Sequence, residues 1–220
     1  MYLPHHFEMS DVSGFLAAHP AALLVTAAGG GYPSATLMPY VLEGDRCLMH
    51  MARANEHWRQ IAPGSPALAV VQGEQAYVSP SAYPSKARHG RVVPTWNYSV
   101  VHLTGWVTVH DDVAWVRDLV TRLTELHEQG RAKPWAVTDA PPKYVDGQLK
   151  AIVGIELVVE RVEAKAKLSQ NRDAEDRAGV LAFLEQEAPG VAAAIVTERQ
   201  AAAGTPATAR RRRSTASPSS

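Results

Sequence analysis

Two polar segments carry the residue types most suited to ligand binding. Residues 167–172, Lys-Leu-Ser-Gln-Asn-Arg, follow a long β-branched run and are too polar to continue it as a buried strand. Lys167 and Arg172 can donate charge-assisted hydrogen bonds, and the residues between them add neutral donors. Residues 93–98 add the flat faces of Trp96 and Tyr98. Together the segments predict a site for a planar, phosphorylated ligand, and they suit a flavin mononucleotide (FMN) better than a nucleic acid.

A third segment, residues 51–58, leaves an expected strand and enters an expected helix. This geometry presents backbone N–H groups and Arg53 to an anion, although composition alone favours a polar helix cap. His50 and His57 lie nearby, but no third ligand stands at a recognisable spacing, so we expect no metal site. The sequence also contains no nucleophile elbow, Walker phosphate loop, dinucleotide fingerprint or paired-cysteine motif, so hydrolase and nucleotidase functions have no support.

Two further features have a structural explanation beside the functional one. The Ser79 hydroxyl could bind a phosphate or close a turn around Pro80, and the turn is favoured. Trp96 and Tyr98 could belong to a barrel core, because aromatic residues are common at strand starts. The proline-rich connection before Trp96 favours a site there.

Strands make up most of the elements that must position these residues. The connection over residues 79–95 is long for a compact domain, and we interpret it as a ligand lid. Successive hairpin-linked strands, one dominant late helix and a returning strand predict a mainly β (α+β) fold, a closed or split antiparallel β-barrel with flanking helices. The expected strands cover residues 21–26, 36–42, 47–51, 67–72, 98–110 and 152–162, and the expected helices begin at Ser10 and Asn55 or cover residues 115–126 and 173–186.

Composition indicates one domain in a chain of 220 residues. The 22 basic and 22 acidic residues balance, so neither a nucleic acid nor a membrane is the default partner. Cys47 is the single cysteine, which excludes an intrachain disulfide and favours a reducing compartment. The first residues resemble no signal peptide, and no apolar run has the length of a membrane helix. We therefore expect a soluble, cytoplasmic protein.

The end of the chain differs from the rest in composition. Beyond Glu187 the sequence is rich in Ala, Thr, Arg and Ser, and it includes the four-arginine block from Arg210 to Arg213. We expect a domain over residues 1–187 and a low-complexity basic tail over residues 188–220, largely disordered, in which residues 191–200 could form a helical turn or two. Without the arginine block the chain would be mildly acidic.

Five blocks of sequence resemble the PaiB family, often called FMN-binding negative transcriptional regulators, whose fold is a split β-barrel of the pyridoxamine-phosphate-oxidase type. The resemblance covers residues 1–187, departs at Ala82, where a tryptophan is expected, and leaves the basic tail unexplained. The blocks are Met1-Tyr2-x-Pro4-x-x-Phe7, His50-x-Ala52-Arg53-x-Asn55-x-x-Trp58, Tyr77-Val78-Ser79-Pro80-Ser81-x-Tyr83, Val93-Pro94-Thr95-Trp96-Asn97-Tyr98 with Val101-His102 and Gly105, and Lys167-Leu168-Ser169-Gln170-Asn171-Arg172.

The resemblance implies a homodimer with FMN in a cleft made by both subunits. Arg53 and Asn55 would bind the phosphate side, and residues 167–172 would reach across the interface. A dianionic phosphate suits arginine, and a ring system suits an apolar shelf with a few donors. The expected cofactor-binding residues are Arg53, Asn55, Trp58, Ser79, Thr95, Trp96, Asn97, Lys167, Ser169, Gln170, Asn171 and Arg172.

The resemblance leaves regulator and enzyme as alternatives. The first is a negative transcriptional regulator that responds to flavin or its redox state, with DNA or a regulatory protein as a partner; the sequence shows no clear helix-turn-helix. The second is an FMN-dependent oxidoreductase acting on a small molecule with NAD(P)H, in which His102 and Tyr83 are candidates for proton exchange. A third is a dimeric scaffold that has lost the cofactor, which Ala82 keeps open.

Overall fold

The computed structural model describes residues 1–27 and 31–204, and the chain forms two compact units. The first unit combines Met1–Ala17, Gln72–Val101 and the chain from Ala164 onward. The second unit combines Ala18–Val71 with His102–Glu163. Each unit is therefore assembled from segments that are far apart in the sequence.

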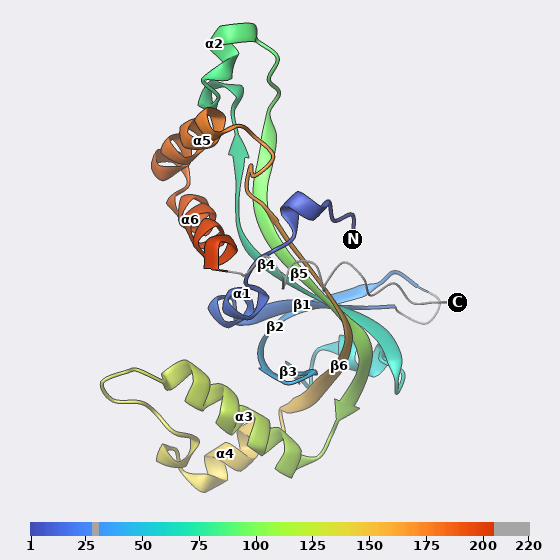
Figure 1. Ribbon diagram of the computed structural model, residues 1–220. Coiled ribbons are helices and arrows are strands. Elements are labelled where there is room, and N and C mark those ends of the chain that lie inside the picture. Colours follow the sequence, from blue (N-terminus) through green and yellow to red (C-terminus); the bar gives the residue numbers. More distant parts are fainter. Residues whose placement is uncertain (28–30, 205–220) are drawn as a thin grey trace. The chain divides into compact units, whose positions relative to one another are not determined.

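Six strands close into a barrel in the order β1-β2-β3-β6-β5-β4 (Figure 1). The pairing of β1 with β2 and β4, and of β3 with β2 and β6, is antiparallel. This confirms the predicted mainly β (α+β) fold. Five of the six strands are longer than expected, and β6 runs on to Lys167. The strands are β1 (Ala21–Thr26), β2 (Ser34–Glu43), β3 (Arg46–Ala52), β4 (Ser65–Val78), β5 (Thr95–His110) and β6 (Ile152–Lys167).

Strand β1 of the second unit buries alternate residues, as a half-exposed strand does. In β1 the side chains of Ala22, Leu24 and Thr26 are buried, whereas those between them are exposed or half-buried. The Cys47 thiol of β3 is fully buried, which raises its pKa to about 12. Gly105 in β5 has a steric role, because a Cβ there would lie 1.8 Å from the Val158 carbonyl oxygen.

Helices of the second unit cover one region of the barrel. The main helix, α3 (Val113–Glu128), is capped by Asp112 and buries Val116, Leu119 and Leu123, as its helical spacing predicts. It packs against α4 (Pro142–Leu149), which lies beside it in Figure 1. The expected helix after Asn55 is a short 3₁₀ turn, η2 (Glu56–Gln60), and a second 3₁₀ turn, η4 (Val137–Asp139), precedes α4.

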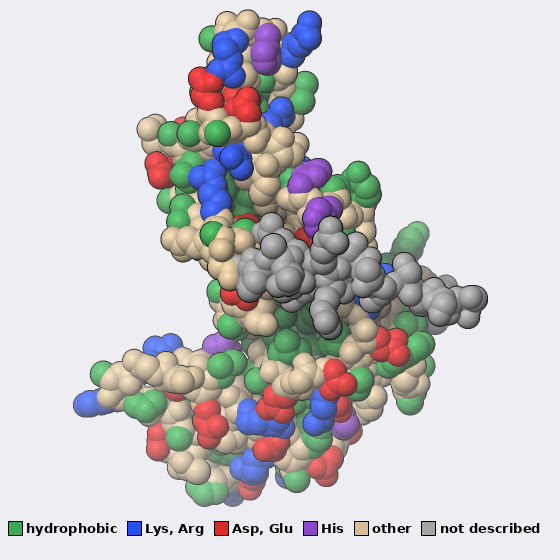
Figure 2. Space-filling model, in the orientation of Figure 1, with side chains coloured by type: hydrophobic (Ala, Val, Ile, Leu, Met, Phe, Trp, Pro, Cys, Tyr) green, Lys and Arg blue, Asp and Glu red, His purple; other side chains and the backbone are tan. Residues whose placement is uncertain are grey.

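The first unit contains the remaining helices. The long connection before β5 holds two short ones, η3 (Pro80–Ala82) and α2 (Ser85–His89). The N-terminal segment forms η1 (His5–Phe7) and α1 (Val12–Ala18). Figure 2 shows basic and acidic side chains intermixed over α2 and the start of α5 (Ala174–Glu187). This surface therefore carries no field of a single sign.

The last described element is α6 (Pro189–Gly204), a helix where the sequence suggested a turn or two at the start of a tail. It packs on α5 and buries Val191, Ala192 and Ile195. Ile195 follows Val191 by four residues and Ala192 by three, which are the spacings of neighbours on a helix surface. The folded chain therefore continues well beyond residue 187. Residues 205–220, with the block from Arg210 to Arg213, lie outside the described residues. None of the helices in the described ranges is long and apolar enough to cross a bilayer.

Candidate functional site

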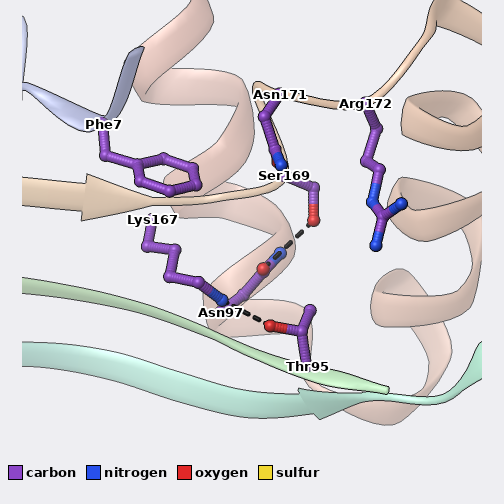
Figure 3. Close-up of a pocket in the computed structure, with 7 residues that line it drawn as sticks. All are labelled: Phe7, Thr95, Asn97, Lys167, Ser169, Asn171 and Arg172. Atoms are coloured by element: carbon purple, nitrogen blue, oxygen red, sulfur yellow. Dashed lines mark hydrogen bonds between the residues drawn. The ribbon is translucent and has the colours of Figure 1, made fainter. Parts of the chain in front are cut away.

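A polar cavity of about 130 Å³ lies in the first unit, between the start of β5 and the end of β6 (Figure 3). Its walls combine two cations, four neutral polar side chains and one aromatic ring. They are Phe7, Thr95, Asn97, Lys167, Ser169, Asn171 and Arg172.

Strand geometry brings these side chains together. Thr95 and Asn97 stand two residues apart on β5 and so point to the same side of the strand, whereas Trp96 between them is exposed. The Lys167 ammonium, at the end of β6, donates hydrogen bonds to the Thr95 hydroxyl and the Trp96 carbonyl, both at 2.5 Å. The Ser169 hydroxyl donates to Asn97 Oδ1 at 3.1 Å. These three hydrogen bonds join the wall from β5 to the wall from β6.

The turn after β6 is held in an uncommon backbone conformation. Ser169 has a φ of +66°, in the left-handed region that residues with a Cβ seldom adopt. The Gln170 side chain fixes this turn, since its Oε1 accepts a hydrogen bond from the Leu168 amide and its Nε2 donates to the Ala166 carbonyl. Gln170 therefore shapes the cavity wall without lining it.

The cavity is electropositive. Burial lowers the pKa of Lys167, and the nearby positive charges of Lys165 and Arg172 lower it further. The Arg172 guanidinium lies over the Tyr83 ring, 4.7 Å from its centroid. No carboxylate belongs to the lining formed by the described residues. An anion is the natural ligand for such a wall.

The segment over residues 79–95 is fastened to α5 by a buried carboxylate. Asp176 accepts hydrogen bonds from the Ser85 amide at 3.0 Å and the Ser85 hydroxyl at 2.8 Å. Burial raises the pKa of Asp176, but the Ser85 bonds and the charges of Arg88 and Arg172 outweigh it and leave that pKa below its ordinary value. The carboxylate is therefore held ionised and keeps Tyr83, two residues before Ser85, next to Arg172.

The residues of the 51–58 segment belong to the second unit and are engaged locally. The Arg53 guanidinium pairs with the Asp111 carboxylate and donates from Nε to the Lys150 carbonyl at 2.8 Å. Asn55 caps η2 by accepting from the His57 amide. Trp58 Nε1 donates to the Arg53 carbonyl at 3.0 Å. Each of these contacts supports the cap interpretation that composition favours.

A buried histidine adjoins this segment. His57 forms a hydrogen bond through Nε2 with the Thr26 hydroxyl at 2.9 Å and another through Nδ1 with the Thr36 hydroxyl at 2.8 Å. Asn55 Nδ2 also donates to the Thr36 hydroxyl, at 3.2 Å. Burial lowers the pKa of His57, so the imidazole is neutral at pH 7. No group of three or more His, Cys, Asp or Glu side chains suited to a metal occurs in the described parts of the chain.

Half of the twelve expected cofactor-binding residues line the cavity: Thr95, Asn97, Lys167, Ser169, Asn171 and Arg172. Ser79, Trp96 and Gln170 lie in the same unit but outside the lining. Ser79 caps η3 by accepting from the Ser81 amide, and Trp96 faces outward against Tyr77. The other three, Arg53, Asn55 and Trp58, are in the second unit.

Phe7 is a lining residue that we did not expect from the sequence. Its place in the first of the PaiB-like blocks is the only sequence feature that pointed to it. The N-terminal segment is tied to β6 by Lys165, whose ammonium donates to the Tyr2 carbonyl at 3.0 Å and lies 6.0 Å from the Phe7 ring centroid. This tie places the Phe7 ring at the cavity.

The donor set suits the anionic and polar parts of a flavin nucleotide. Asn97 is fully buried, and its Nδ2 has no hydrogen-bond partner among the described residues, which leaves a donor for a ligand. The volume of about 130 Å³ is nevertheless well below the roughly 300 to 1,000 Å³ typical of sites for ligands of this size. The cavity therefore fits part of FMN and needs further walls to hold its ring system.

Comparisons with known proteins identify the family. Residues 1–161 match a family model described as "Putative FMN-binding domain". The chain is 31% identical over 199 residues to "Protease synthase and sporulation protein PAI 2" of Bacillus subtilis, a match that covers 85% of this chain and 90% of that protein.

Solved structures agree on the fold. The FAD and heme binding protein of Mycobacterium smegmatis aligns with a TM-score of 0.53 at 20% identity, covering 74% of this chain and 73% of that one. The flavocytochrome Anf3 of Azotobacter vinelandii aligns with a TM-score of 0.51 at 20% identity, covering 76% and 71%. The chain thus belongs to the PaiB family of FMN-binding flavoproteins, which are built on an antiparallel split β-barrel.

Proposed function

We propose that this protein is an FMN-binding negative transcriptional regulator of the cytoplasm that responds to its flavin or to the redox state of that flavin. The observation that carries the proposal is the relationship to the Bacillus subtilis protein, which extends over most of both chains and whose name refers to protease synthesis and sporulation. Bound FMN would supply one- or two-electron redox chemistry. The residues of this chain bind and orient it.

The proposed cofactor site uses the expected residues in three groups. Arg53 and Asn55 bind the phosphate side with the support of Trp58, and Ser79 and residues 95–97 line the ring. Residues 167–172 reach the flavin of a second copy. The small volume of the cavity within one unit supports this arrangement, because a homodimer would add the walls that a flavin ring requires.

The first test is an FMN titration followed by absorbance. We expect saturable binding by the intact chain and a loss of at least tenfold in affinity for the Arg53→Ala/Arg172→Ala double variant, because each arginine offers a charge-assisted hydrogen bond. Arg117→Ala is the matched control, since it removes an arginine that pairs with Asp146 on the surface of the second unit. A protein that ignores FMN would refute the proposed cofactor site.

Binding to DNA requires a separate test. Arg210 to Arg213 form the clearest block of single-sign charge in the sequence, and Figure 2 shows mixed charges over α3 and α4. If this block binds duplex DNA, deletion of residues 205–220 abolishes a gel shift that weakens steeply with salt. A gel shift that survives the deletion would show that the arginine block does not bind the DNA. A regulatory protein would then be the partner to test.

The second candidate function is an FMN-dependent oxidoreductase that uses NAD(P)H. It is favoured by the cation-lined cavity, which suits an anionic substrate. Burial raises the pKa of Tyr83 despite the opposing effect of Arg172, so its hydroxyl keeps the proton and can act as an acid but not as a base. Reduction of bound FMN by NADH or NADPH, followed at the flavin absorbance band, favours this function; a flavin that neither nucleotide reduces argues for the regulator.

A further inference from the structure

The cavity of the first unit has one more cation-lined surface than FMN needs. FMN carries a single phosphate group, and the proposed function seats that group at Arg53 and Asn55. Lys167 and Arg172 form a second cationic wall, and no carboxylate belongs to the lining formed by the described residues. The two cations repel one another, which is one reason why the pKa of Lys167 is lowered. A dianion would offset that repulsion.

Free donors converge on this cavity. Two of the three N–H bonds of the Lys167 ammonium point to Thr95 and Trp96, which leaves the third for a ligand. Asn97 Nδ2 is buried without a partner in the described chain. The Arg172 guanidinium lies over the Tyr83 ring, 4.7 Å from its centroid, and its planar set of donors suits a forked contact with an oxyanion. Figure 3 shows Thr95, Asn97, Lys167 and Arg172 among the side chains that line this cavity.

Size and charge select the ligand. A volume of about 130 Å³ equals roughly four water molecules at about 30 Å³ each, which accommodates a tetrahedral oxyanion with a few attached atoms but no tricyclic ring. Two cationic side chains match two negative charges, and several neutral donors match the remaining oxygen lone pairs.

We propose that the cavity lined by Lys167, Arg172 and Asn97 binds the phosphate group of a second small molecule, distinct from FMN. The source of the group is either inorganic phosphate or a small phosphate monoester. The inference rests on the proposed function, which seats the FMN phosphate at Arg53 and Asn55 and brings residues 95–97 and 167–172 to the flavin ring, so the second phosphate group would be bound beside that ring. Whichever function holds, the site makes this protein a receptor for a phosphorylated substrate or effector.

The test is calorimetric titration of the full chain with inorganic phosphate and with phenyl phosphate, each before and after saturation with FMN. We expect one phosphate per chain in both states, and the tighter of the two probes identifies the source. Lys167→Met and Arg172→Gln should each weaken binding about tenfold to a hundredfold, as the loss of a hydrogen bond to a charged group does. Lys143→Met, on the exposed face of α4, is the matched control and should bind as the parent does.

A second variant guards against misfolding. Asn97→Asp preserves the shape of the side chain and the bond from Ser169 but places a carboxylate in the cavity, so it should abolish phosphate binding while the circular dichroism spectrum is unchanged. Phosphate binding that survives all three substitutions overturns the proposal. A second outcome also overturns it. If phosphate competes with FMN, and if Lys167→Met and Arg172→Gln lose the preference for FMN over riboflavin, the cavity seats the flavin phosphate. A chain that binds phosphate but no flavin refutes the proposed function and leaves this site standing.

Discussion

Lys167 is the residue whose charge state controls the cavity. Its pKa is lowered by burial and then by Lys165 and Arg172. Because only the ammonium form can pair with phosphate, bound phosphate favours protonation, and binding must weaken as the pH rises through the lowered pKa of Lys167. We predict that phosphate affinity declines at a less alkaline pH than an ordinary lysine would give.

Lys167→Arg is the matched variant for this prediction. Arginine stays charged throughout the alkaline range, so the variant should lose the pH dependence and retain binding. Titration calorimetry with inorganic phosphate between about pH 7 and pH 10 gives both curves. Parallel curves for the two proteins would show that another group titrates.

His57 should make the second unit sensitive to acid. Its folded pKa lies below the unfolded value because burial disfavours the imidazolium, so the unfolded chain binds the proton first. Stability is therefore full above the unfolded pKa of about 6.5 and falls as the pH drops below it. We predict that His57→Gln is less stable than the parent at pH 7 yet loses less stability between about pH 7 and pH 5, measured by urea denaturation.

The histidines His50 and His102 also have lowered pKa values, mainly through burial, and they remain in both proteins. The difference between the two pH profiles therefore reports His57 alone. Equal slopes would mean that the two threonine hydroxyls accommodate the imidazolium without penalty.

Sequence patterns could predict the cavity residues as a group but not the side chains that enter it. Alternation along a strand separates Thr95 and Asn97 from Trp96, and this period was available from the sequence once a strand was assumed. Gln170 could not be excluded in the same way, because its role depends on a left-handed turn at Ser169 that no local pattern announces. Phe7 reaches the cavity through a contact between distant segments.

At the scale of elements, α5 rests on the η3 turn without a side chain between them. A Cβ at Gly179 of α5 would lie 2.3 Å from the Ala82 carbonyl oxygen, a backbone atom that cannot easily move. We predict that Gly179→Ala destabilises the protein by about 1 to 3 kcal/mol, as overpacking usually does. Chemical denaturation measures the change in the free energy of unfolding.

Gly147→Ala in α4 is the matched control. A Cβ at Gly147 would meet no atom within 4 Å, and the residue is exposed. The substitution should therefore stabilise the chain by about 0.4 to 1 kcal/mol, because alanine restricts the unfolded state. If Gly179→Ala were also stabilising, α5 and η3 would have to separate at little cost.

The sequence predicted the bounds of an element well where one face of that element is buried. It predicted them poorly where the local pattern of apolar residues is weak. A short apolar run located β1, and the helical spacing of Val116, Leu119 and Leu123 located α3. The α6 helix was underestimated because its alanine-rich sequence resembles a linker, and its stability comes from packing on α5. The 3₁₀ turn after Asn55 shows that a good cap predicts where a helix starts and not how far it extends.

At the scale of the whole molecule, α6 completes the first unit. Glu198 of α6 accepts hydrogen bonds from the Ser10 amide, and three apolar side chains of the helix are buried. We predict that deletion of residues 189–220 lowers the free energy of unfolding by at least about 3 kcal/mol. The burial of Val191 and Ile195 stabilises the protein by roughly 1.5 to 3 kcal/mol each, and the deletion removes this contribution.

Deletion of residues 205–220 alone is the control for that truncation, because every contact just named is retained. Its urea midpoint should match that of the full chain. Equal midpoints for both deletions would show that α6 is dispensable, and the boundary expected at residue 187 would then describe the stable domain.

The buried thiol of Cys47 can report when the barrel opens. Thiolate is the reactive form, and a pKa of about 12 together with complete burial withholds it from alkylating reagents in the native state. Because Cys47 is the only cysteine in the sequence, each alkylated molecule is one in which β3 has become exposed to solvent. The rate of alkylation therefore acts as a clock for transient unfolding of this strand, readable by mass spectrometry without any engineered probe.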